Sequence, residues 1–160
     1  QRGRSARALL PGLQLNAAAT FLFMKRHHYD TAWDMLLRAF VRAFPPSEGS
    51  AQLVLKLGYL EDEKARLRTR KALLSCADCP NELPANVFII ARRLQDAEVH
   101  VLFGLADVYV EPGRGSGCMS VTAMQMMALG RPVVGPAWSF CGRCRVPAGA
   151  GRGARGPAGG

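Results

Sequence analysis

Residues 107–134, DVYVEPGRGSGCMSVTAMQMMALGRPVV, contain a short apolar strand, a glycine-rich turn, a helix and a second apolar strand in direct succession. A strand that runs through a glycine-rich turn into a helix, and then into another strand, is typical of a βαβ unit. Gly130 suits the end of the helix over 121–129, because the residue just past a helix often adopts the left-handed conformation. We therefore predict two strands joined by a crossover helix.

Apolar blocks upstream of this unit predict further strands. They lie at residues 21–24, 51–57 and 86–91, and they join the two strands at 107–110 and 132–134. All are continuous apolar runs rather than alternations of apolar and polar residues. Continuous runs are typical of strands that are buried on both faces, as in a parallel sheet covered by helices.

Helical patterns alternate with these strands. Residues 30–44, DTAWDMLLRAFVRAF, repeat apolar side chains every three or four positions, and we expect Asp30 or Thr31 to cap this helix and Pro45 to end it. Residues 61–75 and 95–106 predict two more helices, and 79–84 a loop. Alternating strands and helices predict an α/β fold, a doubly wound parallel sheet of the Rossmann-like type, with all strand carboxyl ends along one edge.

The two ends of the chain differ from this pattern. Residues 1–19 show no periodicity, and from Ser139 onward glycine and arginine dominate without any acidic residue. We predict a loosely ordered lead-in over 1–19, one Rossmann-like domain over 20–138, and a disordered Gly/Arg-rich tail over 139–160.

The net charge of +9 is concentrated in the same two ends. The lead-in and the tail carry seven arginines and no acid between them, and without these seven the surplus falls to two. Domains that bind nucleic acid usually concentrate basic residues on the folded surface that docks. We therefore expect no specific nucleic-acid partner. No apolar run reaches the roughly 18 residues of a membrane span, and no secretory signal is evident, so we expect a cytoplasmic protein without a transmembrane segment.

The predicted carboxyl edge of the sheet carries features that suit an anion. Glycines in the 113–117 turn allow close backbone approach, and the start of the helix after them offers unpaired amides. Basic residues follow four of the five strands, namely Arg26, His27, His28, Lys56, Arg92, Arg93 and Arg114. A ligand with a diphosphate would explain this gathering. An ordinary tight turn, and charged residues that simply follow buried strands, are the alternative.

Three stretches together resemble one enzyme family. Residues 114–139, RGSGCMSVTAMQMMALGRPVVGPAWS, resemble the glycine turn, helix and Pro-Val-Val strand of retaining GT-B glycosyltransferases of family 4. Residues 106–115, ADVYVEPGRG, resemble the strand before that turn. Residues 21–40, FLFMKRHHYDTAWDMLLRAF, resemble the first strand, arginine loop and helix of the family's C-terminal domain.

The resemblance implies the C-terminal, nucleotide-sugar-binding half of a two-domain enzyme. Such enzymes transfer a sugar from a nucleotide-diphosphate donor to an acceptor hydroxyl with retention of anomeric configuration, and they need no metal or other cofactor. Their acceptor site lies largely on an N-terminal domain. We therefore expect a fragment whose partners are the donor, an unidentified acceptor and that missing domain.

Family positions can be carried over residue by residue. Arg26 falls where the family has the arginine that contacts the donor diphosphate, and Thr31 and Ala32 fall on its Lys-Gly pair. Gln125 falls on the second conserved carboxylate and Gly117 on the first. The lysine and both carboxylates are therefore absent, and Gln125 can bond a ribose but carries no charge.

The resemblance places the phosphate cradle on backbone amides of Cys118, Met119 and Ser120. The full donor-binding set that it implies is Arg26, Thr31, Gly115, Gly117, Cys118, Met119, Ser120 and Gln125. It assigns no catalytic residue. The candidates to replace the missing lysine are Arg92, Arg93 and Arg114, and the nearest spare carboxylate is Glu111.

Two other function classes remain open. The first is a degenerate, non-catalytic GT-B-like binding module, because the family lysine and carboxylates are missing. The second is a zinc- or nucleic-acid-binding module, because Cys76 and Cys79 form one CxxC pair and Cys141 and Cys144 another. The gap between the pairs far exceeds the roughly 15 to 20 residues of common zinc ribbons. We therefore expect reduced cysteines and no metal site.

Overall fold

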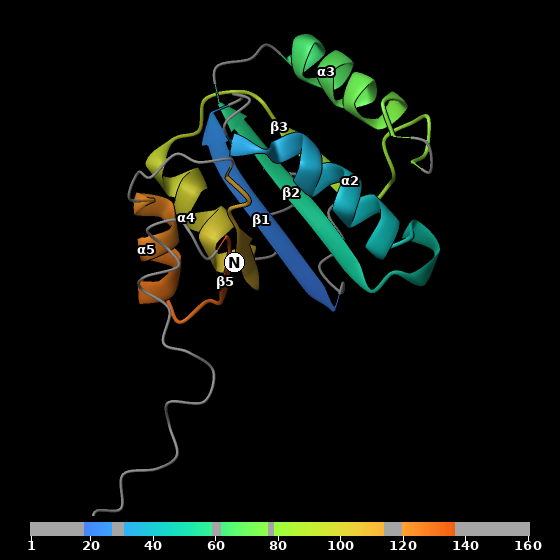
Figure 1. Cartoon of the computed structure of the whole chain (residues 1–160). Coiled ribbons are helices and arrows are strands. Elements are labelled where there is room, and N and C mark those ends of the chain that lie inside the picture. Colours follow the sequence, from blue (N-terminus) through green and yellow to red (C-terminus); the bar gives the residue numbers. More distant parts are fainter. Residues whose placement is uncertain (1–17, 27–30, 59–61, 77–78, 114–119, 137–160) are drawn as a thin grey trace, which may run out of the picture.

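The computed structural model describes residues 18–26, 31–58, 62–76, 79–113 and 120–136 (Figure 1). Its core is a five-stranded sheet in the order β3-β2-β1-β4-β5. The strands are β1 (Ala19–Arg26), β2 (Ala51–Gly58), β3 (Val87–Ile90), β4 (Val108–Val110) and β5 (Val133–Val134). Every pairing is parallel, which confirms the predicted doubly wound sheet. The predicted lead-in over 1–19 and tail over 139–160 lie almost wholly outside the described residues and stay predictions.

Helices cover both faces of the sheet (Figure 1). The helices α2 (Trp33–Ala43) and α3 (Asp62–Leu74) pack on one face, and a short 3-10 helix, η2 (Pro46–Glu48), follows α2. The helices α4 (Asp96–Leu105) and α5 (Val121–Ala128) pack on the other. Among the described residues no helix has the length and apolar character to cross a bilayer.

The continuous apolar runs are explained by this double cover. Along β1, Leu22 belongs to the core under α4 and α5, whereas Phe23 belongs to the core under α2 and α3. Seven of the eight residues of β2 are buried for the same reason. Each large apolar side chain that is fully buried contributes about 1.5 to 3 kcal/mol, so both faces stabilise the sheet.

The start of α2 differs from the prediction. The helix begins at Trp33, and its N-cap residue is Ala32, which makes no side-chain capping bond. Thr31 is therefore not the N-cap residue, and Asp30 lies outside the described residues. Ala32 adopts a left-handed conformation with φ 53° and ψ 30°, which an L-residue with a Cβ rarely adopts.

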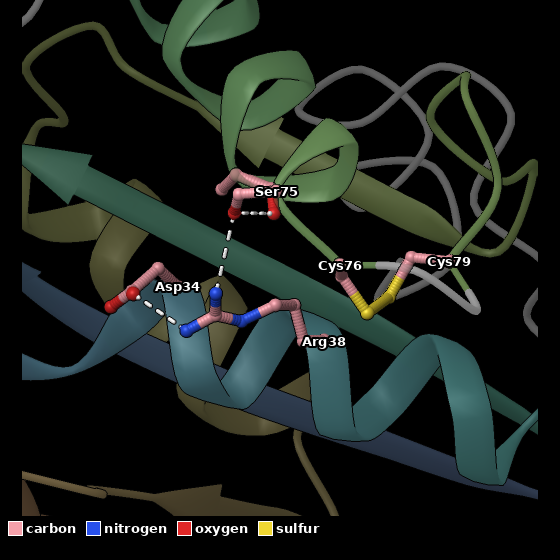
Figure 2. Close-up of a disulfide and its surroundings, with 6 residues drawn as sticks. Asp34, Arg38, Ser75, Cys76 and Cys79 are labelled. Carbon is pink, nitrogen blue, oxygen red and sulfur yellow. Dashed lines mark hydrogen bonds and ion pairs between the residues drawn. A yellow bond between two sulfur atoms is a disulfide. The ribbon is translucent and has the colours of Figure 1, made fainter.

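The cysteine pair that follows α3 also differs from the prediction. Cys76 and Cys79 form a disulfide rather than two free thiols, and a disulfide leaves neither sulfur as a thiolate for zinc (Figure 2). Within the described residues no group of three or more His, Cys, Asp and Glu side chains is arranged to hold a metal ion. Cys141 and Cys144 lie outside these residues.

Beside this disulfide, α2 and α3 are joined through one arginine (Figure 2). Arg38 donates from Nη1 to Ser75 Oγ at 3.3 Å and from Nη2 to Asp34 Oδ2 at 3.0 Å. Asp34 lies in the first turn of α2, where its negative charge also suits the helix dipole.

Candidate functional site

The sheet has a topological switch point between β1 and β4. These two strands are neighbours, yet the chain leaves β1 for α2 on one face and leaves β4 for α5 on the other. In open α/β sheets a ligand usually binds at such a point, outside the carboxyl ends of the strands. Leu22 pairs with Tyr109, so the carboxyl ends of β1 and β4 lie next to each other.

An ion pair links β1 to the residue after β4 at the switch point. Lys25 Nζ of β1 donates to Glu111 Oε1, directly after β4. The Glu111 side chain is only 9% exposed, and its backbone N–H donates to the carbonyl of Val134 at 2.7 Å. The other carboxylate oxygen, Oε2, is buried and has no hydrogen-bond partner in the described part of the chain.

The polar groups at the opposite, amino edge are mostly satisfied by one another. Gln52 Nε2 donates to Thr20 Oγ1 at 2.8 Å, and the Thr20 N–H donates to Asp107 Oδ2 at 2.8 Å. Asn86 donates to two carbonyls, although its Oδ1, like Glu111 Oε2, has no partner among the described residues. Glu111 differs because an ionised carboxylate loses more than an amide when an oxygen stays unpaired. A hydrogen-bond donor from a ligand would therefore stabilise the carboxyl edge more than the amino edge.

The helix α5 begins at the same edge. Ser120 is its N-cap and is buried, and its Oγ accepts a hydrogen bond from the Ala123 N–H at 3.2 Å. Before it, Gly113, the first glycine of the predicted turn, adopts a positive φ of 24°. The start of a helix carries a partial positive charge that favours anions.

The start of α2 lies beside the carboxyl end of β1 (Figure 1). Thr31 and Ala32 are both buried there. The left-handed Ala32 occupies the position at which the resembled family has glycine, the residue that takes this conformation without cost.

The structure locates some of the predicted donor-binding residues. The backbone of Arg26 ends β1, opposite Gly58. Thr31 lies two residues before α2, and Ser120 is the N-cap of α5. Gln125 is exposed on α5. The other predicted members lie outside the described residues, as do the neighbouring bases of the same edge; these are Gly115, Gly117, Cys118, Met119, His27, His28 and Arg114.

Arg92 pairs with an acidic residue of α4. It donates to both oxygens of Glu98, at 2.6 and 3.1 Å, and so supports the capping box at the start of α4. Lys56 is buried within β2 and also has a partner. Among the side chains that the structure describes at the switch point, Lys25 is a cation paired with Glu111. The sequence interpretation missed Lys25 because it placed this residue just past the end of an apolar strand. The sequence did contain one indication: Lys25 directly precedes Arg26, which was already predicted to lie at the carboxyl edge of the sheet.

Glu98 gives this part of the fold a predictable acid sensitivity. Hydrogen bonds from Arg92 and from the Gln95 N–H lower the pKa of Glu98 from an ordinary 4.5 to about 2. A lowered pKa stabilises the fold above about pH 4.5, and this contribution is lost as the pH falls toward 2. We expect the native chain to lose more stability than Glu98→Gln between about pH 5 and 2, measured by urea unfolding. Parallel pH profiles of the two proteins would contradict this.

Comparisons with known proteins bear on the fold alone. No protein-family model and no curated protein matches the sequence. The catalytic domain of Arabidopsis thaliana starch synthase IV, bound to ADP and acarbose, is similar in structure with a TM-score of 0.64 and 13% identity over 92% of this chain and 28% of that one. A UDP-forming trehalose-phosphate synthase from Burkholderia xenovorans, in complex with glucose-6-phosphate, is also similar in structure. Its TM-score is 0.62, with 15% identity over 89% of this chain and 33% of that one.

A further similar structure is that of the Escherichia coli protein described as trehalose-6-phosphate bound with UDP-2-fluoro glucose. Its TM-score is 0.58, with 12% identity over 89% of this chain and 37% of that one. These neighbours are GT-B glycosyltransferases, and the five-stranded sheet matches their Rossmann-like fold. The chain spans about a third of the length of each.

Proposed function

We propose that this chain binds a nucleotide-diphosphate sugar at the carboxyl edge between β1 and β4, as the C-terminal half of a retaining GT-B glycosyltransferase of family 4. The observation that carries the proposal is the part-buried Lys25–Glu111 pair at the switch point. It supplies a cation and an unpaired carboxylate oxygen where a doubly wound sheet binds ligands.

The charges suit the two ends of such a donor. An ammonium group has three donors, so Lys25 can hold Glu111 and still donate to a phosphate oxygen. Arg26 and the start of α5 add positive charge for the diphosphate. The unpaired Oε2 of Glu111 can accept from a hydroxyl of the ribose or of the sugar. No resident metal ion is part of this proposal.

The reaction assigned to the complete enzyme is sugar transfer with retention. The bond between the anomeric carbon and the diphosphate oxygen breaks, the acceptor hydroxyl oxygen bonds to that carbon, and the hydroxyl proton is released. Negative charge develops on the departing diphosphate, and one fixed donor to such a charge is worth about 3 to 4 kcal/mol of barrier. In this proposal Lys25 supplies the charge that Thr31 cannot. The acceptor site belongs to an N-terminal GT-B domain, a proposed partner.

A non-catalytic donor-binding module is the second candidate. It is favoured by Gln125, which is exposed and neutral at the position of a family carboxylate. The two candidates differ only once the chain is joined to an N-terminal half. Sugar transfer that appears with the native residues, or after Thr31→Lys, supports the enzyme, whereas inactivity of both supports the binding module.

The proposal is tested by calorimetric titration of the chain with uridine and guanosine diphosphates at two salt concentrations. We expect saturable binding of at least one of them. Arg26→Ala should weaken it by about tenfold or more, because a hydrogen bond to a charged group is lost. Arg131→Ala removes the same charge at the amino edge, beside Asp107, and should change affinity by less than about twofold.

Three results would contradict the proposal. They are the absence of saturable heat with either diphosphate, an equal loss of affinity in both variants, and stoichiometric zinc binding or steeply salt-dependent DNA binding in place of nucleotide binding.

A further inference from the structure

A pocket lies under α3, away from the switch point. Its volume is about 380 Å³, within the range of about 300 to 1,000 Å³ typical of small-molecule sites. The lining residues are Arg66, Thr69, Arg70, Glu82, Leu83 and Ile89. Ile89 lies on β3, at the edge of the sheet, and β2 separates β3 from β1. The pocket is therefore a different place from the proposed donor site.

Two arginines give this pocket its charge. Arg66 and Arg70 are one helical turn apart on α3, and both are exposed. No acidic side chain of the described residues pairs with either of them, although Lys64 and Arg68 of the same helix do have partners. Like charges four residues apart destabilise a helix. A bound anion would remove that repulsion.

The remaining lining residues restrict the ligand further. Thr69 is buried, and its hydroxyl donates to the Ala65 carbonyl at 2.7 Å. The two guanidinium groups are therefore the main hydrogen-bond donors among the described lining residues. Leu83 and Ile89 offer apolar surface beside them. Glu82 is the one acid among the described lining residues, so these residues together carry a net positive charge.

We propose that this pocket binds a small organic phosphate monoester. Its phosphate carries close to two negative charges and three acceptor oxygens, which match two guanidinium groups, and arginine is suited to bidentate contact with such a group. Leu83 and Ile89 contact the organic part. A carboxylate has one charge and two oxygens and satisfies the pair less completely.

The test uses three probes on the full chain: inorganic phosphate, phenyl phosphate and benzoate, followed by calorimetry or by chemical shifts of the arginine side chains. We expect phenyl phosphate to bind with one-to-one stoichiometry and more tightly than either other probe, since only it combines the dianion with an apolar group. Arg66→Gln and Arg70→Gln should each weaken phenyl phosphate by about tenfold or more. Glutamine keeps a good helix propensity, so both variants should fold.

Arg68→Gln is the matched control, because it changes the net charge equally on the same helix but lies outside the pocket lining. It should leave the affinity within about twofold, while Glu82→Gln should tighten binding by removing a like charge. Absence of saturable phenyl phosphate binding, an equal loss in Arg68→Gln, or benzoate binding as tight as phenyl phosphate would each overturn the proposal. Unfolding curves of each variant exclude misfolding as the cause.

Discussion

Replacing Lys25 by methionine is expected to lower the free energy of unfolding by about 3 kcal/mol. Methionine keeps the length and the apolar stem of the side chain but removes the ammonium group from Glu111. The carboxylate is then buried without a partner for either oxygen among the described residues. Removing one partner of a buried ion pair typically costs about 3 to 5 kcal/mol, and the partial exposure of Lys25 places this pair at the lower end.

The double variant Lys25→Met/Glu111→Leu separates charge from packing. Apolar residues in place of a buried ion pair are often neutral or stabilising, so the double variant should recover most of the loss. Urea unfolding followed by circular dichroism at neutral pH measures all three proteins. A double variant as unstable as the single one would show that the pair contributes through packing. The recovered protein should still fail to bind nucleoside diphosphate, since both charged groups are gone.

Replacing Phe40 by alanine is expected to cost about 3 to 5 kcal/mol of stability. Phe40 is 3% exposed and lies in the core that joins α2 to the sheet. Its ring centroid lies 5.9 Å from that of Phe21 on β1 and 5.1 Å from that of Phe44. The substitution removes both aromatic contacts and leaves a cavity under the helix whose start borders the switch point.

Met35→Ala is the control on the same helix. Met35 is 47% exposed, and a surface substitution of this kind usually changes stability by less than about 0.5 kcal/mol. Thermal or urea unfolding compares the two variants with the native chain. Equal losses for Phe40→Ala and Met35→Ala would mean that α2 is not held by this core.

Local patterns were enough to predict the fold. The continuous apolar run over 51–57 predicted a strand buried on both faces, and β2 has this burial. The periodicity over 30–44 predicted α2, and Pro45 follows its end at Ala43. These features depend on neighbours in the chain, so a single sequence contains them.

The site required contacts between distant residues. Lys25 and Glu111 lie 86 positions apart, and only the order of the strands brings them together. The ion pair between Arg92 and Glu98 could not be predicted from the charge of Arg92 alone. A basic residue that follows a strand can bind either a ligand or an acidic residue at the start of a helix. The alanine at position 32 gave no local indication of its left-handed backbone, because a residue with a Cβ normally avoids that conformation.

The central claim is the location of nucleotide binding, and amide chemical shifts of the isotopically labelled chain during a titration with uridine diphosphate test it most directly. We predict saturable shifts at Lys25, Gly113 and the first turn of α5, with the amides of the amino edge, such as Ala51 and Asp107, unchanged. Shifts that concentrate at the amino edge, or no saturable shifts at all, would contradict the account.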